Sequence, residues 1–248
     1  MTSEGDPGPR LSVAGHLEEL RRRLAICLLA LMATIGISLT QVNRIVPWLQ
    51  RPVHGLISRF AFFSPTEPLV AYVKVAVLAG FLLAMPIILG QLWGFVRLGL
   101  TRQERAAGVA FIGWGSALFI AGVAFAYYAL LPASLRFLLG IGTAYFEPMI
   151  SIDAYLSFVT TLGFWCGVVF ELPAVLFLLA KAGVVTPEWL RQQRPYAILI
   201  LVIIAAVVTP TTDPVNLLLL AVPMVLLYEV SIIVVRYGIP QAASGTKR

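Results

Sequence analysis

One carboxylate, Glu171, lies deep inside a long apolar run, within the stretch VVFELPAVLF. A carboxylate at the centre of a membrane-spanning helix costs about 2.5 to 3.5 kcal/mol, and such residues usually face a cavity or a partner and carry function. The structural alternative is a protonated glutamic acid that is hydrogen-bonded to the carbonyl freed by Pro173. We interpret Glu171 as a functional polar site inside the membrane.

A second set of carboxylates lies among arginines outside the apolar runs. In the segment HLEELRRRL, Glu18 and Glu19 stand four residues before Arg22 and Arg23. This spacing favours ion pairs along one face of an interfacial helix. The same carboxylates could instead face a ligand, so both interpretations stay open at this point.

A third carboxylate, Glu104, lies in the segment LTRQER. The pattern Thr101-x-x-Glu104 is typical of a capping box at the start of a helix. A group of carboxylates on one side of the membrane is also what a pair of guanidinium groups needs for bidentate recognition. Glu19 and Glu104 are therefore candidates for binding a positively charged peptide.

Two other charged residues interrupt apolar runs. Lys74 lies about one and a half turns inside the second run, and we expect its long stem to reach the outer interface rather than an ion-pair partner or a ligand. Glu229 lies near the end of the last run, and Arg236 shares its helix face seven residues later. A structural pair between them is as plausible as a functional site.

The remaining reactive residues do not form a catalytic or metal-binding pattern. The two cysteines, Cys27 and Cys166, both lie in apolar runs, and His16 and His54 are far apart. These spacings match neither a disulfide framework nor a metal motif. They also do not place a nucleophile beside a histidine base, as nucleophilic catalysis would need. We therefore expect no enzyme activity, no metal and no cofactor.

Composition indicates that lipid is the solvent for most of the chain. Apolar residues make up 59% of the sequence, charged residues only 12%, and the mean hydropathy is +0.90. A soluble domain usually has about half apolar and about a quarter charged residues. The formal charge of +6 is distributed in a way that favours a membrane over nucleic acid.

A spanning helix needs about 20 apolar residues. The sequence predicts one polytopic membrane domain over residues 1–248, with flexible ends at 1–14 and 238–248. The first apolar run is long and lacks a small-residue cleavage site, so we interpret it as a retained span rather than a signal peptide. The six predicted spans cover about residues 24–42, 69–90, 106–131, 154–180, 196–209 and 215–235.

The distribution of Lys and Arg sets the predicted orientation, because cytoplasmic connections are enriched in these residues. With six spans, thirteen of them fall on the side that holds both termini and four on the other. Both ends are therefore predicted to be cytoplasmic. The fifth span has only about 13 apolar residues, roughly 20 Å against a hydrocarbon core of roughly 30 Å, so the bilayer thins there or water enters. Residues 43–68 and 132–153 are expected to form interfacial, partly helical caps.

Seven segments in this order resemble the TatC family, the core subunit of the twin-arginine protein translocase. The resemblance covers about residues 15 to 237, nearly the whole chain. Each segment alone is modest, but the ordered set is highly specific. The segments are HLEELRRRL (16–24), SPTEPLVAYVKVAV (64–77), MPIILGQLWGFV (85–96), LTRQER (100–105), DAYLSFV (153–159), FELPAVLFLLAKAGVVTPEWLRQQRPYAI (170–198) and TPTTDPVNLLLLAVPMVLLYE (209–229).

The resemblance implies a receptor for signal peptides that bear two consecutive arginines. Such proteins assemble with the single-span proteins TatA and TatB, and with further copies of themselves, to move folded proteins across the membrane. The proton-motive force drives this transport without nucleotide hydrolysis. We expect a prokaryotic plasma membrane location.

The resemblance also assigns roles to individual positions. It implies signal-peptide binding at Glu19, Arg21, Phe95 and Glu104, and it matches Glu171 to the intramembrane glutamate of the family. Thr209, Asp213 and Asn216 match positions where a partner helix docks.

Two positions depart from the family pattern. Val96 follows Phe95 where members often have proline, so we expect the geometry of that loop to differ from the family pattern. Asn216-Leu217 stands where members often carry Ser-Gln. Leu217 cannot make the polar contact to a partner helix, and Asn216 is expected to substitute.

The sequence thus predicts an all-α integral membrane protein, a bundle of six helices curved around a concave face that contains Glu171, with short fifth and sixth helices. Two alternatives remain. A proton-coupled small-molecule transporter could use Glu171, but the chain lacks the internal symmetry common in such proteins. An intramembrane hydrolase would need a second acid or an activated nucleophile.

Overall fold

The computed structural model describes residues 13–53, 60–96, 108–140, 149–209 and 213–238. These residues are almost entirely helical, and they form no strand beyond a single backbone bridge between Ala61 and Ser151. Five helical segments are long and apolar enough to cross a membrane. They are Leu17–Val53, Glu67–Val96, Gly108–Gly140, Ile152–Lys181 and Pro214–Gly238. The predicted all-helical membrane class is therefore confirmed.

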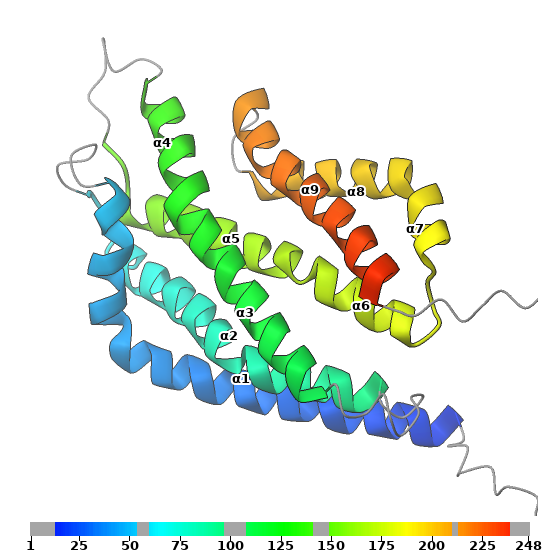
Figure 1. The fold of residues 1–248 in the computed structure, drawn as a ribbon. Coiled ribbons are helices and arrows are strands. Elements are labelled where there is room, and N and C mark those ends of the chain that lie inside the picture. The colour runs from blue at the N-terminus through cyan, green and yellow to red at the C-terminus, as the bar shows by residue number, and fades with distance from the viewer. Residues whose placement is uncertain (1–12, 54–59, 97–107, 141–148, 210–212, 239–248) are drawn as a thin grey trace, which may run out of the picture.

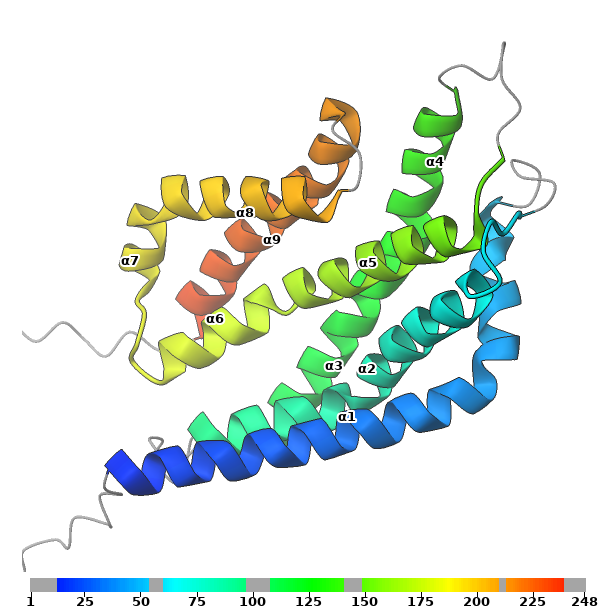
Figure 2. The ribbon, with the colours of Figure 1, turned by 180° about the vertical axis from the view of Figure 1, so that it is seen from behind.

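The first helix is longer than the predicted span. Helix α1 runs over Val13–Gln50 and is followed by one turn of 3₁₀ helix, η1, over Arg51–Val53. The arginine-rich segment before the apolar run and the start of the predicted cap both belong to α1, because nothing breaks the helix before Pro47. The helix bends sharply in its second half (Figures 1 and 2), and Pro47 removes one of its backbone hydrogen bonds.

Two tyrosines hold the end of α1 against the rest of the molecule. The last four carbonyls of a helix lack partners within it. The Tyr127 hydroxyl donates to the carbonyl of Trp48, and the Tyr155 hydroxyl donates to that of Leu49, each at 2.6 Å. The Trp48 and Tyr127 rings also stack, with centroids 4.2 Å apart. These contacts fix the bent end of α1 on two other helices.

The central helices form long rods. Helix α2 covers Glu67–Val96. Helix α3, over Gly108–Phe125, continues through a π-helical turn, η4 (Ala126–Leu130), into α4 (Leu131–Gly140), so this rod extends well past the predicted end at residue 131. Helices α5 (Ile152–Phe170) and α6 (Leu172–Lys181) are separated only by Glu171. Figure 1 shows these rods crossing one another.

The last part of the chain is a hairpin of unequal helices. Short α7 (Pro187–Gln192) leads into α8 (Arg194–Val208), and α9 covers Pro214–Gly238. Helix α8 has 15 residues, so it is about 22 Å long and shorter than the hydrocarbon core of a bilayer. It is apolar but falls below the length of the five long segments. A sixth crossing therefore stays a prediction.

Glycines allow several helices to approach closely. Helix α1 packs along α2, and α3 packs on α5, while α9 packs on both α6 and α8 (Figure 2). A Cβ atom on Gly122 of α3 would lie 2.6 Å from the carbonyl oxygen of Cys166 on α5. One on Gly80 of α2 would lie 2.8 Å from the Cα atom of Ile35 on α1. Small residues at helix contacts are typical of membrane proteins, where close van der Waals packing drives association.

Candidate functional site

The carboxylate of Glu19 is bound by an arginine of its own helix. Arg23 Nη2 donates to Glu19 Oε1 at 2.5 Å, so the i,i+4 ion pair considered for this segment forms. Arg23 Nη1 also donates to the carbonyl oxygen of Gln91 on α2 at 3.2 Å. Arg23 therefore joins α1 to the last turns of α2, and Glu19 lies at that junction.

A glycine makes room for this guanidinium group. A Cβ atom at Gly94 would collide with Arg23 Nη1, so any other residue there would push the arginine away. Phe95, one of the predicted binding residues, follows directly and is half-buried in the same turn of α2. Arg21, which points off a different face of α1, is exposed. The structure thus brings Glu19 and Phe95 to neighbouring helices at one end of the bundle.

The connection between α2 and α3 carries the fourth predicted binding residue. Glu104, and with it the proposed capping box that begins at Thr101, lies outside the described residues. The loop that follows Val96, whose geometry was expected to depart from the family pattern, also lies outside the described residues. Trp93 and Phe111 lie on the two helices that flank this loop, and their ring centroids are 5.3 Å apart.

Glu171 is buried in the turn between α5 and α6. The residue is only 5% exposed. Neither Oε1 nor Oε2 has a hydrogen-bond partner among the described residues. The backbone N–H of Glu171 donates to the carbonyl of Val168 at 3.2 Å, and the Glu171 side chain makes no hydrogen bond to the Val169 carbonyl that Pro173 frees. The structural alternative, in which the Glu171 side chain is hydrogen-bonded to the carbonyl freed by Pro173, is therefore not observed.

The surroundings of Glu171 are apolar and tightly packed. Its Oε2 lies 3.1 Å from the position that a Cβ atom on Gly115 of α3 would take. A compact group of apolar side chains from α2, α3 and α6 fills this part of the bundle: Met85, Leu89, Trp93, Phe111, Phe119, Ala174 and Leu178. A buried carboxyl group without partners in such surroundings is costly. This arrangement supports a role for Glu171 beyond stabilising the fold.

The three residues matched to partner docking surround the connection between α8 and α9. Asp213 caps α9: its Oδ1 accepts from the backbone N–H of Asn216 at 2.8 Å, and its Oδ2 accepts from the Asn216 side chain at 2.9 Å. Thr209 is buried and donates to the carbonyl oxygen of Ala205 at 2.8 Å. These polar groups thus order the helix ends, and Asn216 is buried rather than displayed.

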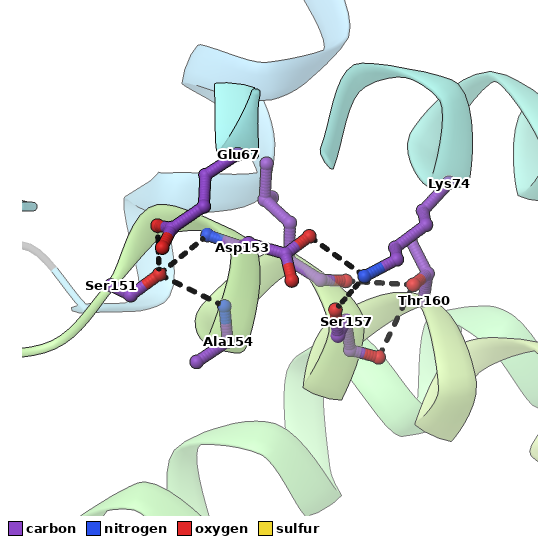
Figure 3. A network of polar contacts seen from close by, with 8 residues as sticks. Glu67, Lys74, Ser151, Asp153, Ala154, Ser157 and Thr160 are labelled. Carbon is purple, nitrogen blue, oxygen red and sulfur yellow. Dashed lines mark hydrogen bonds and ion pairs between the residues drawn. The ribbon is translucent and has the colours of Figure 1, made fainter. Parts of the chain in front are cut away.

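Sequence reasoning about Lys74 was wrong. Its ammonium group donates to Asp153 Oδ1 and to Ser157 Oγ on α5, both at 2.7 Å (Figure 3). The side chain turns toward the neighbouring helix, where the Asp153 carboxylate compensates its charge. The sequence did offer a signal for this pair, because Lys74 is a single cation in one apolar run and Asp153 is an acid at the start of another.

A second polar link strengthens the same end of the bundle. Ser151 donates to Glu67 Oε2 at 2.6 Å and caps α5 by accepting from the backbone N–H groups of Asp153 and Ala154 (Figure 3). Glu67 is the first residue of α2. Helices α2 and α5 are therefore tied together by two contacts that pair charged or polar side chains.

Glu229 forms a structural ion pair, one of its two open interpretations, but its partner is not Arg236. Arg194 Nη2, at the start of α8, donates to Glu229 Oε2 at 2.5 Å. Arg236 instead lies over the ring of Tyr237, 5.7 Å from its centroid. The Tyr228 hydroxyl donates to the carbonyl of Leu190 in α7. These contacts fasten the short helices to α9, which sequence spacing along a single helix could not reveal.

Comparisons with known proteins point to one family. Residues 15–223 match the TatC family, the Sec-independent protein translocase protein (TatC). The chain is 37% identical to the Sec-independent protein translocase protein TatC of Carboxydothermus hydrogenoformans, over 94% of this chain and 96% of that protein. It is 39% identical to the protein of the same description in Aquifex aeolicus, over 88% and 91% of the two chains.

The fold is similar to that in a crystal structure of the twin arginine translocase receptor TatC. The TM-score is 0.81 and the sequences are 38% identical, and the match covers 90% of this chain and 98% of the other.

Proposed function

The chain belongs to the TatC family of Sec-independent protein translocase proteins, and from that membership we propose that it is the receptor for twin-arginine signal peptides in the translocase. It is a multi-pass membrane protein of protein transport. The relatives are translocase components, which fits a transporter subunit rather than an enzyme.

One observation carries the proposal for peptide recognition: the Glu19 carboxylate already forms a close contact with a guanidinium group. Its position between α1 and the last turns of α2 is therefore suited to bind arginine. Glu104 supplies a second carboxylate, so that each arginine of the signal has an anionic partner. Phe95 flanks the site and offers an apolar surface beside the arginine pair, and Arg21, exposed on another face of α1, takes part in binding the peptide.

The apolar part of the signal peptide then inserts along a concave face of the bundle toward Glu171. Support comes from the burial of Glu171 without a hydrogen-bond partner among the described residues. A polar group on the incoming segment would satisfy that carboxyl group, which gives the peptide a defined depth. The short α8 thins the bilayer locally and lowers the barrier to transport.

Partner helices dock near the hairpin of α8 and α9. TatA and TatB pack against α5, α6, α8 and α9, and several copies of the chain assemble into one complex. Thr209, Asp213 and Asn216 contribute to this docking by ordering the α8–α9 connection, in which Thr209 and Asn216 are buried. The proton-motive force supplies the energy, and no cofactor takes part. The membrane is the plasma membrane of a prokaryote, and both ends of the chain are cytoplasmic.

Peptide binding to the purified chain tests the receptor function. A fluorescent peptide that carries Arg-Arg before an apolar segment is titrated with the detergent-solubilised protein, and a Lys-Lys peptide serves as the matched probe. Glu104→Ala should weaken Arg-Arg binding more than Lys-Lys binding, because only a guanidinium group binds a carboxylate through two parallel bonds.

Equal losses for the two peptides would contradict recognition of arginine by Glu104. A deletion strain tests the function in the cell: export of a folded reporter with a twin-arginine signal should stop, and this chain should restore it. A reporter with a signal for unfolded export is the control, and its export should not change.

A further inference from the structure

Arg23 forms an ion pair with Glu19, the carboxylate that the proposed function assigns to an arginine of the signal peptide. Its Nη2 contacts Glu19 Oε1 at 2.5 Å. The side chains of the pair are largely shielded, with exposures of 14% for Arg23 and 25% for Glu19. A guanidinium group that arrives from outside therefore meets a carboxylate with one oxygen already engaged and a second positive charge beside it.

Arg23 has other partners that would hold it after it left Glu19. Its Nη1 donates to the Gln91 carbonyl oxygen and lies within 3.5 Å of Gln91 Oε1. Gln91 lies in the last two turns of α2, where the helix dipole favours a cation. Gly94 leaves the space in which the guanidinium group lies. The arginine can thus release the carboxylate while keeping contacts with α2.

We propose that Arg23 is an internal competitor that occupies Glu19 until a signal-peptide arginine displaces it. The proposal rests on the proposed receptor function. A ligand that uses the same carboxylate can bind only the fraction of molecules in which Arg23 has left Glu19. Arg23 in this way lowers the affinity of every cationic peptide that binds Glu19, and it does so by the same factor for arginine and for lysine.

The test is a comparison of two single substitutions with the same change in charge. Arg23→Gln removes the competitor, while Arg22→Gln removes an exposed arginine one position away and controls for the change in long-range field. Binding of the Arg-Arg and Lys-Lys peptides is measured for both full-length variants, with a thermal melt of each to establish folding.

Arg23→Gln should bind the Arg-Arg peptide roughly tenfold more tightly, about the effect of one charge-assisted hydrogen bond. The Lys-Lys peptide should gain by a similar factor, because both peptides compete with the same arginine, so that the ratio of the two affinities stays nearly constant. Arg22→Gln should change both affinities by less. A purely structural role for Arg23 would not produce a gain in affinity.

Weaker or unchanged Arg-Arg binding in Arg23→Gln would overturn the proposal, and so would an equal gain in Arg22→Gln. Should Arg23→Gln fail to fold, Arg23→Lys keeps the charge but loses the fork, and unchanged Arg-Arg binding in that variant overturns the proposal as well. Glu19→Gln separates the two hypotheses. If it leaves Arg-Arg binding unchanged, then Glu19 is not part of the receptor site, whereas a loss in Glu19→Gln without a gain in Arg23→Gln rejects only the competitor.

Discussion

Single residues carry the polar chemistry of this membrane protein, and they divide into two kinds. Lys74, Arg194 and Glu229 each have an ion-pair partner on another helix or at a helix end. Glu171 has none among the described residues, and it is buried among apolar side chains. A partnered charge is explained by the fold that it holds together, whereas an unpartnered buried carboxyl group calls for a function.

Replacement of Glu171 by leucine should separate stability from function. The carboxyl group loses its hydration in the fold and gains no hydrogen bond from the residues that the structure describes, a penalty of roughly 1 to 3 kcal/mol. Glu171→Leu should therefore melt at or above the temperature of the unmodified chain, while export of a twin-arginine reporter is lost. Thermal unfolding in detergent and an export assay measure the two effects.

The matched control is Glu171→Gln, which keeps a polar group of similar size in the same apolar surroundings. It should melt below the leucine variant, because an amide is also buried there without a partner. A strong drop in melting temperature for Glu171→Leu would show that the carboxyl group stabilises the fold, and it would remove the argument for a functional role.

At the scale of elements, the bundle depends on close approach between helix backbones. Helices α3 and α5 are in contact where Gly122 faces the backbone of Cys166 and Gly167. Polar links between the ends of helices add to this packing: Lys74 with Asp153 ties α2 to α5, and Arg194 with Glu229 ties α8 to α9. The glycine contact involves backbone atoms, which cannot move aside as a flexible side chain can.

Two glycines of α3 offer a matched pair of substitutions. Gly122→Ala would place a methyl group 2.6 Å from the Cys166 carbonyl oxygen, whereas Gly113→Ala would place one in open space. Alanine favours a helix over glycine by about 1 kcal/mol. Gly113→Ala should therefore be neutral or slightly stabilising. Gly122→Ala should destabilise by about 1 to 3 kcal/mol, the usual range for overpacking. Thermal melts of the two variants give the comparison, and equal melting temperatures would count against a tight α3–α5 contact.

At the scale of the whole molecule, the short α8 decides the topology. With the five long segments alone, the two termini would lie on opposite sides of the membrane. The excess of Lys and Arg on one side favours a sixth crossing, which α8 would have to make with about 22 Å of helix. Its exposed apolar side chains, including Leu199, Ile203 and Val207, are suited to contact with lipid.

Reporter fusions test this arrangement. Green fluorescent protein at the C-terminus should fluoresce, since it folds in the cytoplasm, and alkaline phosphatase at the same position should be inactive. A phosphatase fused after Gly140, at the end of α4, should be active because it lies on the opposite side. Active phosphatase at both positions would mean that α8 does not cross the membrane.

The sequence by itself determined the features that depend on local composition. Apolar runs predicted the helical membrane class because a bilayer leaves backbone groups no other partners. The ordered motifs identified the family, and a carboxylate in an apolar run singled out Glu171. The Glu19–Arg23 pair was also within reach, because four residues is one helical turn.

Only the tertiary structure decided which distant groups meet. The partners of Lys74 and Glu229 lie 79 and 35 residues away in the chain, and helix periodicity holds no information about such separations. The same is true of the tyrosines that hold the end of α1, and of the glycine that admits Arg23. Hydropathy identifies the segments that form membrane helices, but packing between the helices determines whether a buried charge has a partner.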